Sequence, residues 1–201
     1  LEDRLMLMEN IVSPRAVREQ AALEDVSAVM EGSPCLCTVG RFSHAKGMDR
    51  AVRIAARLVE MGMNGLRWYL AGYGDEASLR REIAAHGMEE HVVILGKKAN
   101  PYPYMAACGL YVQPSRYEGK AVAVREAQIL GRPVAITRFP TASGHVEDGV
   151  DGVIVPNDEE GAAKALFSLL HDPARLESLA AACRARDYGN RDEILKLEAL
   201  V

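Results

Sequence analysis

The stretch CLCTVGRF, residues 35–42, is an apolar run that ends in a glycine followed by a cation. Continuous apolar runs of this length are typical of parallel strands that are buried on both faces. After Lys46-Gly47, the apolar residues of 51–59 fall on one helical face and the charged residues of 50–60 on the other. The stretch and its continuation therefore predict a strand, a short loop and a helix packed on a sheet.

Further apolar runs, separated by turns and helical periodicity, repeat this pattern along the chain. The predicted strands are Cys35–Gly40, Arg67–Gly72, His91–Leu95, Leu110–Gln113, Val134–Thr137 and Gly152–Val155. Besides the helix after the first strand, helices are predicted at Glu76–Ala85, Tyr102–Ala107, Ala121–Leu130, Asp158–His171 and Pro173–Arg186, with Asp158 as an N-cap. We expect an α/β fold: a Rossmann-like three-layer domain with a mainly parallel six-stranded sheet.

Both ends of the chain carry segments outside this βα series. Arg4–Val12 has the pattern of a strand, and Ser13 as N-cap with Pro14 at the first helical position predicts a helix through Leu23. The tail from Tyr188 has the periodicity of an amphipathic helix, whose apolar face needs a partner. These patterns divide the chain into residues 1–30, 31–187 and 188–201.

Composition excludes several classes of protein. The chain of 201 residues is 49% apolar and 26% charged, as in ordinary globular domains, and its net charge of −4 argues against a nucleic-acid partner. The four cysteines have no Cys-x-x-Cys spacing, so neither a zinc site nor a disulfide framework is expected. Because we find no signal peptide and no apolar run long enough to span a membrane, we expect a cytoplasmic protein.

Two cations follow the first predicted strand. Gly40-Arg41 ends the strand and Lys46-Gly47 begins its helix, so both cations are expected at the carboxyl end of the sheet, where open α/β folds bind ligands. Two cations at that edge suit a pyrophosphate. Taken alone, the pair would fit a solvated loop equally well.

The segment YEGKAVAVREA, residues 117–127, follows the fourth predicted strand and runs into a helix. Gly119 permits close approach to the backbone, and the first N–H groups of the helix at residues 120–122 offer an anion site. Glu118 and Glu126 flank that site at a separation too large for the carboxylate pair of a glycosidase. They are better suited to accept hydrogen bonds from sugar and ribose hydroxyls on either side of a phosphate group.

Two other patterns are weak. Gly72-Tyr73-Gly74 resembles a dinucleotide fingerprint, but it follows the wrong strand and Asp75 next to it would repel a phosphate, so we interpret it as a tight turn. The histidines form no pair with metal-ligand spacing, and no Asp-x-Asp triplet offers a divalent-metal clamp. No metal ligand and no cofactor are therefore expected.

Taken together, these segments resemble the donor-binding, C-terminal half of the family 4 retaining glycosyltransferases, which have the GT-B fold of two Rossmann-like domains. The resemblance spans residues 35–156. It is carried by the ordered set VGRF with KGMD (39–42 and 46–49), LAGYGDE (70–76), VILG (93–96), PSRYEG (114–119) with EA (126–127), GRPV (131–134) and EDGVDG (147–152).

The resemblance implies a role for each matching position. Arg41 and Lys46 would hold the donor diphosphate, Glu118 the sugar hydroxyls and Glu126 the ribose, while the backbone of residues 95–97 would contact the base. The implied donor-binding residues are Gly40, Arg41, Lys46, Leu95, Gly96, Lys97, Glu118, Gly119, Lys120, Ala121, Val122 and Glu126. Of these, Glu118, Arg41 and Lys46 are the implied catalytic residues, in a transfer that retains anomeric configuration and needs no metal.

In these terms, residues 1–30 would be the hinge crossover, residues 31–187 the sugar-nucleotide-binding domain, and residues 188–201 a helix that packs on the missing N-terminal domain. That domain would supply the contacts to a glycan or lipid-linked acceptor, so we expect the chain, which begins at Leu1, to be part of a longer protein. The resemblance implies transfer of a hexosyl group, with a UDP-sugar as the expected donor, in bacterial surface polysaccharide synthesis. The resemblance is also compatible with peripheral association of the full-length protein with the inner face of the membrane.

Two departures from the family pattern leave the sugar open. Lys120-Ala121 stand where many members have an apolar residue and then Gly or Pro, and the family's Gly-Gly turn near residues 139–144 is replaced.

Two alternatives also stay open: a non-catalytic sugar-nucleotide-binding subunit of a two-chain complex, and a nucleotide-sugar epimerase or phosphorylase of the same two-domain shape. An upstream reading frame would separate the first from a fragment. Incubation with the donor alone would reveal an epimerase.

Overall fold

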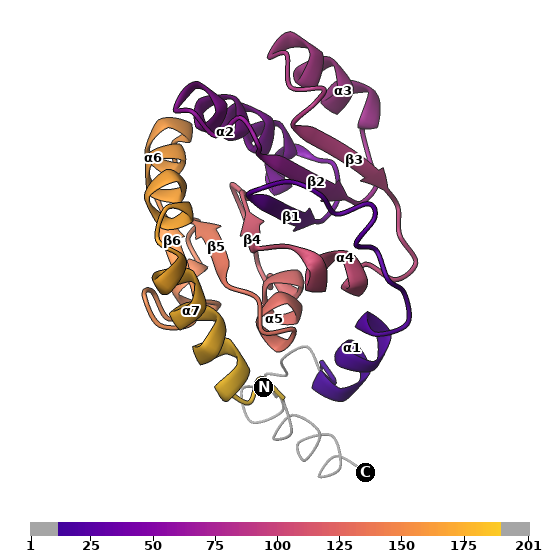
Figure 1. Ribbon diagram of the computed structural model, residues 1–201, viewed down its shortest axis with the longest axis vertical. Coiled ribbons are helices and arrows are strands. Elements are labelled where there is room, and N and C mark those ends of the chain that lie inside the picture. Colours follow the sequence, from indigo (N-terminus) through magenta and orange to yellow (C-terminus); the bar gives the residue numbers. More distant parts are fainter. Residues whose placement is uncertain (1–11, 190–201) are drawn as a thin grey trace, which may run out of the picture.

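A six-stranded sheet runs through the middle of the computed structural model, which describes residues 12–189 (Figure 1). Its strands lie in the order β3-β2-β1-β4-β5-β6 and every neighbouring pair is parallel. They are β1 (Cys35–Val39), β2 (Arg67–Ala71), β3 (Val92–Gly96), β4 (Leu110–Gln113), β5 (Val134–Thr137) and β6 (Val153–Val155). The parallel sheet is confirmed, and each predicted strand end agrees with the structure to within one residue.

Helices cover both faces of the sheet and complete the three layers (Figure 1). They are α1 (Pro14–Ala21), α2 (Met48–Glu60), α3 (Glu76–Ala85), α4 (Tyr102–Ala107), α5 (Val122–Ile129), α6 (Glu159–Leu170) and α7 (Pro173–Ala185). Apolar residues of α2, α3 and α6 pack on one face, and those of α4 and α5 on the other. The Rossmann-like α/β fold expected from the pattern is confirmed.

Strand residues alternate between these two cores, which explains their continuous apolar runs. Leu36 and Trp68 face the helices α2 and α6, whereas Cys37 and Tyr69 face α4 and α5. A buried polar residue at Thr38 is satisfied, because its Oγ1 accepts a hydrogen bond of 2.9 Å from Trp68 Nε1 and donates to a carbonyl of β4.

Side-chain caps begin several helices. Asp158 accepts a hydrogen bond from Gly161 N before α6, and Ser13 accepts one from Ala16 N before α1, as predicted. The helix expected through Leu23 ends at Ala21, and a turn follows.

The strand order places a topological switch point between β1 and β4. From β1 the chain adds β2 and β3 on one side, and it then returns to add β4, β5 and β6 on the other. In open α/β sheets of this order, the loops at the carboxyl ends of the two central strands separate there and leave a crevice for ligands. The β1–α2 loop (residues 40–47) and the β4–α5 loop (residues 114–121) border this point.

The predicted end segments lie mostly outside the described residues. Of the predicted strand Arg4–Val12 only Val12 is described, and of the predicted tail helix only Tyr188 and Gly189, which are not helical. Tyr188 is buried against α1, α5 and α7, and its hydroxyl donates a hydrogen bond of 2.9 Å to Asp151 Oδ2. Among residues 12–189, no helix combines the length and the apolar character needed to cross a membrane.

Candidate functional site

The β1–α2 and β4–α5 loops are joined by an ion pair at the switch point. The ammonium of Lys46 lies 2.6 Å from Glu118 Oε2 and 2.8 Å from Glu118 Oε1. Backbone bonds support the pair, because Arg116 N donates to Ala45 O at 2.8 Å. The two side chains that sequence analysis places in separate roles are therefore in direct contact.

Glu118 is a buried carboxylate held in one orientation. Its side chain is 3% exposed, and beyond Lys46 its Oε1 accepts hydrogen bonds from Ser115 Oγ at 2.7 Å and Gln113 Nε2 at 3.1 Å. Charged donors and a rigid surrounding strengthen such bonds and fix their geometry. Gln113 and Ser115 are positioning residues that sequence analysis missed, since polar side chains at the end of a strand have many other uses.

A cationic cavity of about 510 Å³ opens beside this pair. Its wall includes four residues predicted from sequence, Gly40, Arg41, Lys46 and Lys97, and also residues that sequence analysis missed, such as Tyr73, Lys98 and Pro101. The other predicted positions lie outside this wall: Leu95, Gly96, Glu118, Gly119, Lys120, Ala121, Val122 and Glu126. The cavity thus gathers cations from the ends of β1 and β3, where an anionic ligand would be favoured.

Tyr73 sits at the rim of this cavity between two of its cations. Its ring is partly exposed, with the Arg41 guanidinium carbon 5.8 Å and the Lys97 ammonium 5.4 Å from the ring centroid. Cations at this distance from a ring centroid are attracted by its electron-rich face. Tyr73 therefore attracts both Arg41 and Lys97 to its ring.

The glycines on either side of Tyr73 serve backbone packing. A Cβ built on Gly72 would lie 1.8 Å from Gly40 O, and one on Gly74 would lie 2.4 Å from Phe42 O. The neighbouring Asp75 caps α3 by accepting a hydrogen bond of 2.9 Å from Ser78 N. The interpretation of this segment as a tight turn is confirmed.

The start of the β4–α5 loop is held by the loop that follows β5. Thr141 Oγ1 donates to Glu118 O at 2.8 Å. Burial lowers the pKa of His145. Because a trans peptide points its C=O and N–H in opposite directions, the bond at Glu118 O turns the N–H of Gly119 away from Thr141. A Cβ on Gly119 would meet open space, so packing within the fold does not require glycine there.

Glu126 lies in the middle of α5 and faces Tyr102 of α4. Tyr102 OH donates to Glu126 Oε1 at 2.8 Å. Burial raises the pKa of Glu126, and the bond from Tyr102 partly offsets that shift. Burial and then the adjacent carboxylate raise the pKa of Tyr102 to about 12, so the phenol stays a donor. Sequence analysis missed Tyr102, which stands 24 residues before its partner.

No cluster of three or more His, Cys, Asp or Glu side chains suited to a metal ion occurs within residues 12–189. The charges at the switch point are supplied by side chains and by the N–H groups that begin α5, whose N-cap position is Ala121 without a side-chain cap. Such N–H groups, with the positive end of the helix dipole behind them, bind anions.

Known proteins share the sequence pattern and the fold of this chain. The sequence profile of the family described as "Glycosyl transferases group 1" matches residues 33–172. The chain is 30% identical to alpha-D-kanosaminyltransferase of Streptomyces kanamyceticus, over 82% of this chain and 42% of the relative. It is 28% identical to the lipopolysaccharide core biosynthesis glycosyltransferase LpsE of Rhizobium meliloti (strain 1021), over 70% of this chain and 40% of that protein.

The fold is also similar to that of Anabaena Alr3699/HepE, crystallised in complex with UDP, with a TM-score of 0.81 and 19% identity. That match covers 97% of this chain and 56% of HepE. The chain spans less than half the length of the two curated relatives, 42% and 40% respectively.

Proposed function

Because this chain belongs to the Glycosyl transferases group 1 family, we propose that it is the donor-binding domain of a retaining hexosyltransferase. The donor is a nucleotide sugar, with UDP as its nucleotide. The observation that carries this proposal is the Lys46–Glu118 pair at the switch point, at the edge of a cavity lined by further cations. This arrangement offers a cation to a phosphate and a carboxylate to a hydroxyl within one site.

The diphosphate lies between the cavity and the start of α5 in this proposal. Arg41 and Lys46 face its oxygens from the cavity wall. The N–H groups at the start of α5 approach it from the other side. Negative charge that develops on the diphosphate as the sugar leaves is stabilised by these fixed cations and dipoles, which are already in place before the reaction. The proposal includes no metal cofactor.

The two glutamates bind hydroxyls at opposite ends of the donor. Glu118 accepts hydrogen bonds from the sugar, and Glu126, held by Tyr102, accepts them from the ribose. The base lies near the end of β3, against the backbone of Leu95, Gly96 and Lys97. Lys97, Lys98 and Pro101 line the cavity just after this strand.

The acceptor is a glycan or lipid-linked sugar bound through another part of the protein. The named activity of LpsE, lipopolysaccharide core biosynthesis, supports a role in bacterial surface polysaccharide synthesis. Free, buried cysteines at Cys35, Cys37, Cys108 and Cys183 suit a reducing compartment, so we place the reaction in the cytoplasm, at the inner face of the membrane when the acceptor is lipid-linked.

Calorimetry of two single variants tests these assignments. Glu126→Ala is expected to weaken UDP by about 1.5–3 kcal/mol, the range for hydrogen bonds to a charged group. Glu118→Ala is expected to leave UDP nearly unchanged and to weaken only UDP-glucose and UDP-N-acetylglucosamine. Equal losses for UDP and for the sugar nucleotides in both variants would contradict the assignment.

A further inference from the structure

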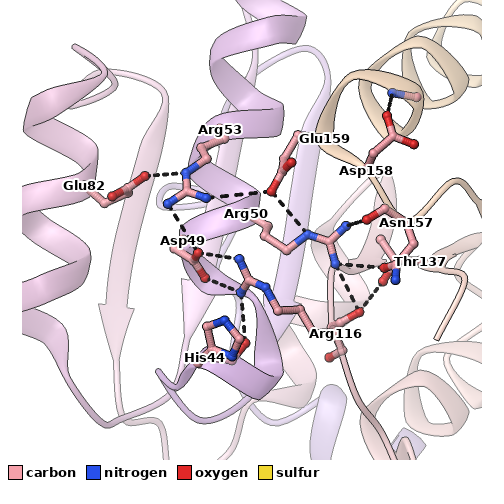
Figure 2. Close-up of polar contacts among 12 residues, drawn as sticks. His44, Asp49, Arg50, Arg53, Glu82, Arg116, Thr137, Asn157, Asp158 and Glu159 are labelled. Carbon is pink, nitrogen blue, oxygen red and sulfur yellow. Dashed lines mark hydrogen bonds and ion pairs between the residues drawn. The ribbon is translucent and has the colours of Figure 1, made fainter. Parts of the chain in front are cut away.

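A second set of contacts joins the two halves of the site. Arg116, in the β4–α5 loop, donates two parallel hydrogen bonds to Asp49 in the first turn of α2, at 2.8 and 2.7 Å (Figure 2). Its Nη1 also donates to His44 O at 2.9 Å. Neither Arg116 nor Asp49 lines the cationic cavity, so this link lies outside the proposed phosphate site.

The Arg116–Asp49 link is well shielded and well supported. The Arg116 and Asp49 side chains are 18% and 28% exposed, so a forked guanidinium–carboxylate pair is screened less than an exposed one. Arg53 holds Asp49 from the other side, at 3.5 Å, and Arg53 itself pairs with Glu82 of α3 (Figure 2). Arg53 therefore fixes the Asp49 carboxylate on α2 independently of Arg116.

The backbone on the Glu118 side is braced as well. The carbonyl of Ser115 accepts a hydrogen bond of 2.6 Å from Thr137 Oγ1 and a longer one of 3.5 Å from the buried Arg50 (Figure 2). Arg50 also reaches Asn157 in the loop before α6. These contacts fix the residues just before Arg116, and they connect the loop to β5 through Thr137 and to α2 through Arg50. Arg116 connects it to Asp49 and to the β1–α2 loop.

Ligand binding should affect the Lys46–Glu118 pair and the Arg116–Asp49 pair differently. Without ligand, the Lys46–Glu118 pair joins the two loops in addition to the backbone hydrogen bond from Arg116 N to Ala45 O. In the proposed complex, Lys46 turns to the diphosphate and Glu118 to the sugar, so their mutual contact is lost. The Arg116–Asp49 pair contacts neither ligand group and stays closed.

We propose, on the basis of the function argued above, that Arg116 is a positioning residue: its fork on Asp49 keeps Glu118 in register with Lys46 when the ligand separates them. Arg116 is two residues before Glu118 in the chain, so a shift of this loop moves the carboxylate relative to the sugar. Arg41 and Lys46 belong to the opposite loop, which the Arg116 side chain contacts at His44 O, so their diphosphate contacts depend on Arg116 less than the sugar contact of Glu118 does.

Calorimetry with UDP, UDP-glucose and UDP-N-acetylglucosamine tests this role. Arg116→Ala is expected to weaken the sugar nucleotides about tenfold, the lower end for loss of hydrogen bonds to a charged group, and UDP less than about twofold. Arg116→Lys keeps the charge but not the fork, so its loss is expected to be intermediate. Arg53→Ala is the matched control, since Arg53 also pairs with Asp49 but touches no residue of the β4–α5 loop; it is expected to change neither ligand more than about twofold.

A double-mutant cycle separates positioning from general destabilisation. If Arg116 acts through Glu118, the Arg116→Ala change should weaken sugar nucleotides no further once Glu118→Ala is present. Additive losses, or equal losses for UDP and sugar nucleotides in Arg116→Ala or Arg116→Lys, would overturn the positioning role. If wild-type protein binds both ligand classes and the Arg116 variants keep its affinities, only this inference fails. If wild-type protein binds neither, the proposed function fails with it.

Discussion

Lys46 and Glu118 stand 72 residues apart in the chain, yet the Lys46 ammonium contacts both oxygens of the Glu118 carboxylate, at 2.8 and 2.6 Å. The pair closes the switch point of the sheet, because one residue belongs to the loop after β1 and the other to the loop after β4. A cation and a carboxylate that neutralise each other in the free protein are ready to separate onto the phosphate and the sugar of one ligand.

Removal of the cation should affect both stability and binding. Lys46→Met leaves Glu118, 3% exposed, with only its neutral donors, so a loss of about 1–3 kcal/mol in the free energy of unfolding is expected. UDP should also bind more weakly. Lys164→Met, which breaks an exposed ion pair with Glu160, is the control and should change neither quantity appreciably. Equal stability of the two variants in urea denaturation would contradict the structural importance of the Lys46–Glu118 pair.

Two glycine substitutions should behave in opposite ways. Gly119→Ala adds a Cβ into open space and should change the free energy of unfolding by less than about 1 kcal/mol, yet weaken sugar nucleotides because they approach the backbone there. Gly72→Ala would bring its Cβ to 1.8 Å from Gly40 O and should cost more than about 2 kcal/mol. Thermal denaturation and UDP-glucose titration measure the two effects. A Gly119→Ala protein that binds UDP-glucose like wild type would remove this residue from the site.

Acidification should weaken UDP binding at a higher pH than for an ordinary glutamate. Burial raises the pKa of Glu126, and only the ionised carboxylate is a pure acceptor for ribose hydroxyls. Tyr102→Phe removes the bond that lowers this pKa, so the loss of affinity should move to still higher pH. The dissociation constant of UDP, measured across pH for wild type and Tyr102→Phe, checks both shifts. Identical profiles would show that Tyr102 does not tune Glu126.

The Arg116–Asp49 pair should make stability sensitive to strong acid. Burial alone would raise the pKa of Asp49, but the hydrogen bond and charge of Arg116 outweigh it and hold the pKa below the ordinary value of 3.8. A depressed carboxyl pKa in the folded state means that the stabilisation is present above the unfolded pKa and is lost as pH falls through the folded pKa. Melting temperatures should therefore fall more steeply below about pH 4 for wild type than for Asp49→Asn. Parallel curves would argue against a stabilising pair.

The fold could be predicted from local pattern, because the central strands are buried on both faces and the surface helices on one. Runs such as residues 35–39 and 67–71 are mostly apolar because Leu36 and Cys37, or Trp68 and Tyr69, enter opposite cores. Caps such as Asp158 need only the three residues that follow, so they too are visible in the sequence.

The site could be predicted only in part. Arg41 and Lys46 are recognisable because a strand end fixes their place, and they do line the cavity. The contact between Lys46 and Glu118, and the support of Glu126 by Tyr102, join segments far apart in the chain and leave no periodic signal. The place of Tyr73 in the cavity wall could not be predicted for another reason: the glycines on either side of it account for the turn by themselves.

The central claim, that a nucleoside diphosphate binds at the switch point, is tested most directly by amide NMR of the ¹⁵N-labelled chain during titration with UDP. The account predicts saturable shifts at residues 40–47, in the β1–α2 loop, at 96–100, from the last residue of β3 onward, and at 118–123, which lead into α5. Shifts confined to other parts of the molecule, or none at millimolar UDP, would contradict it.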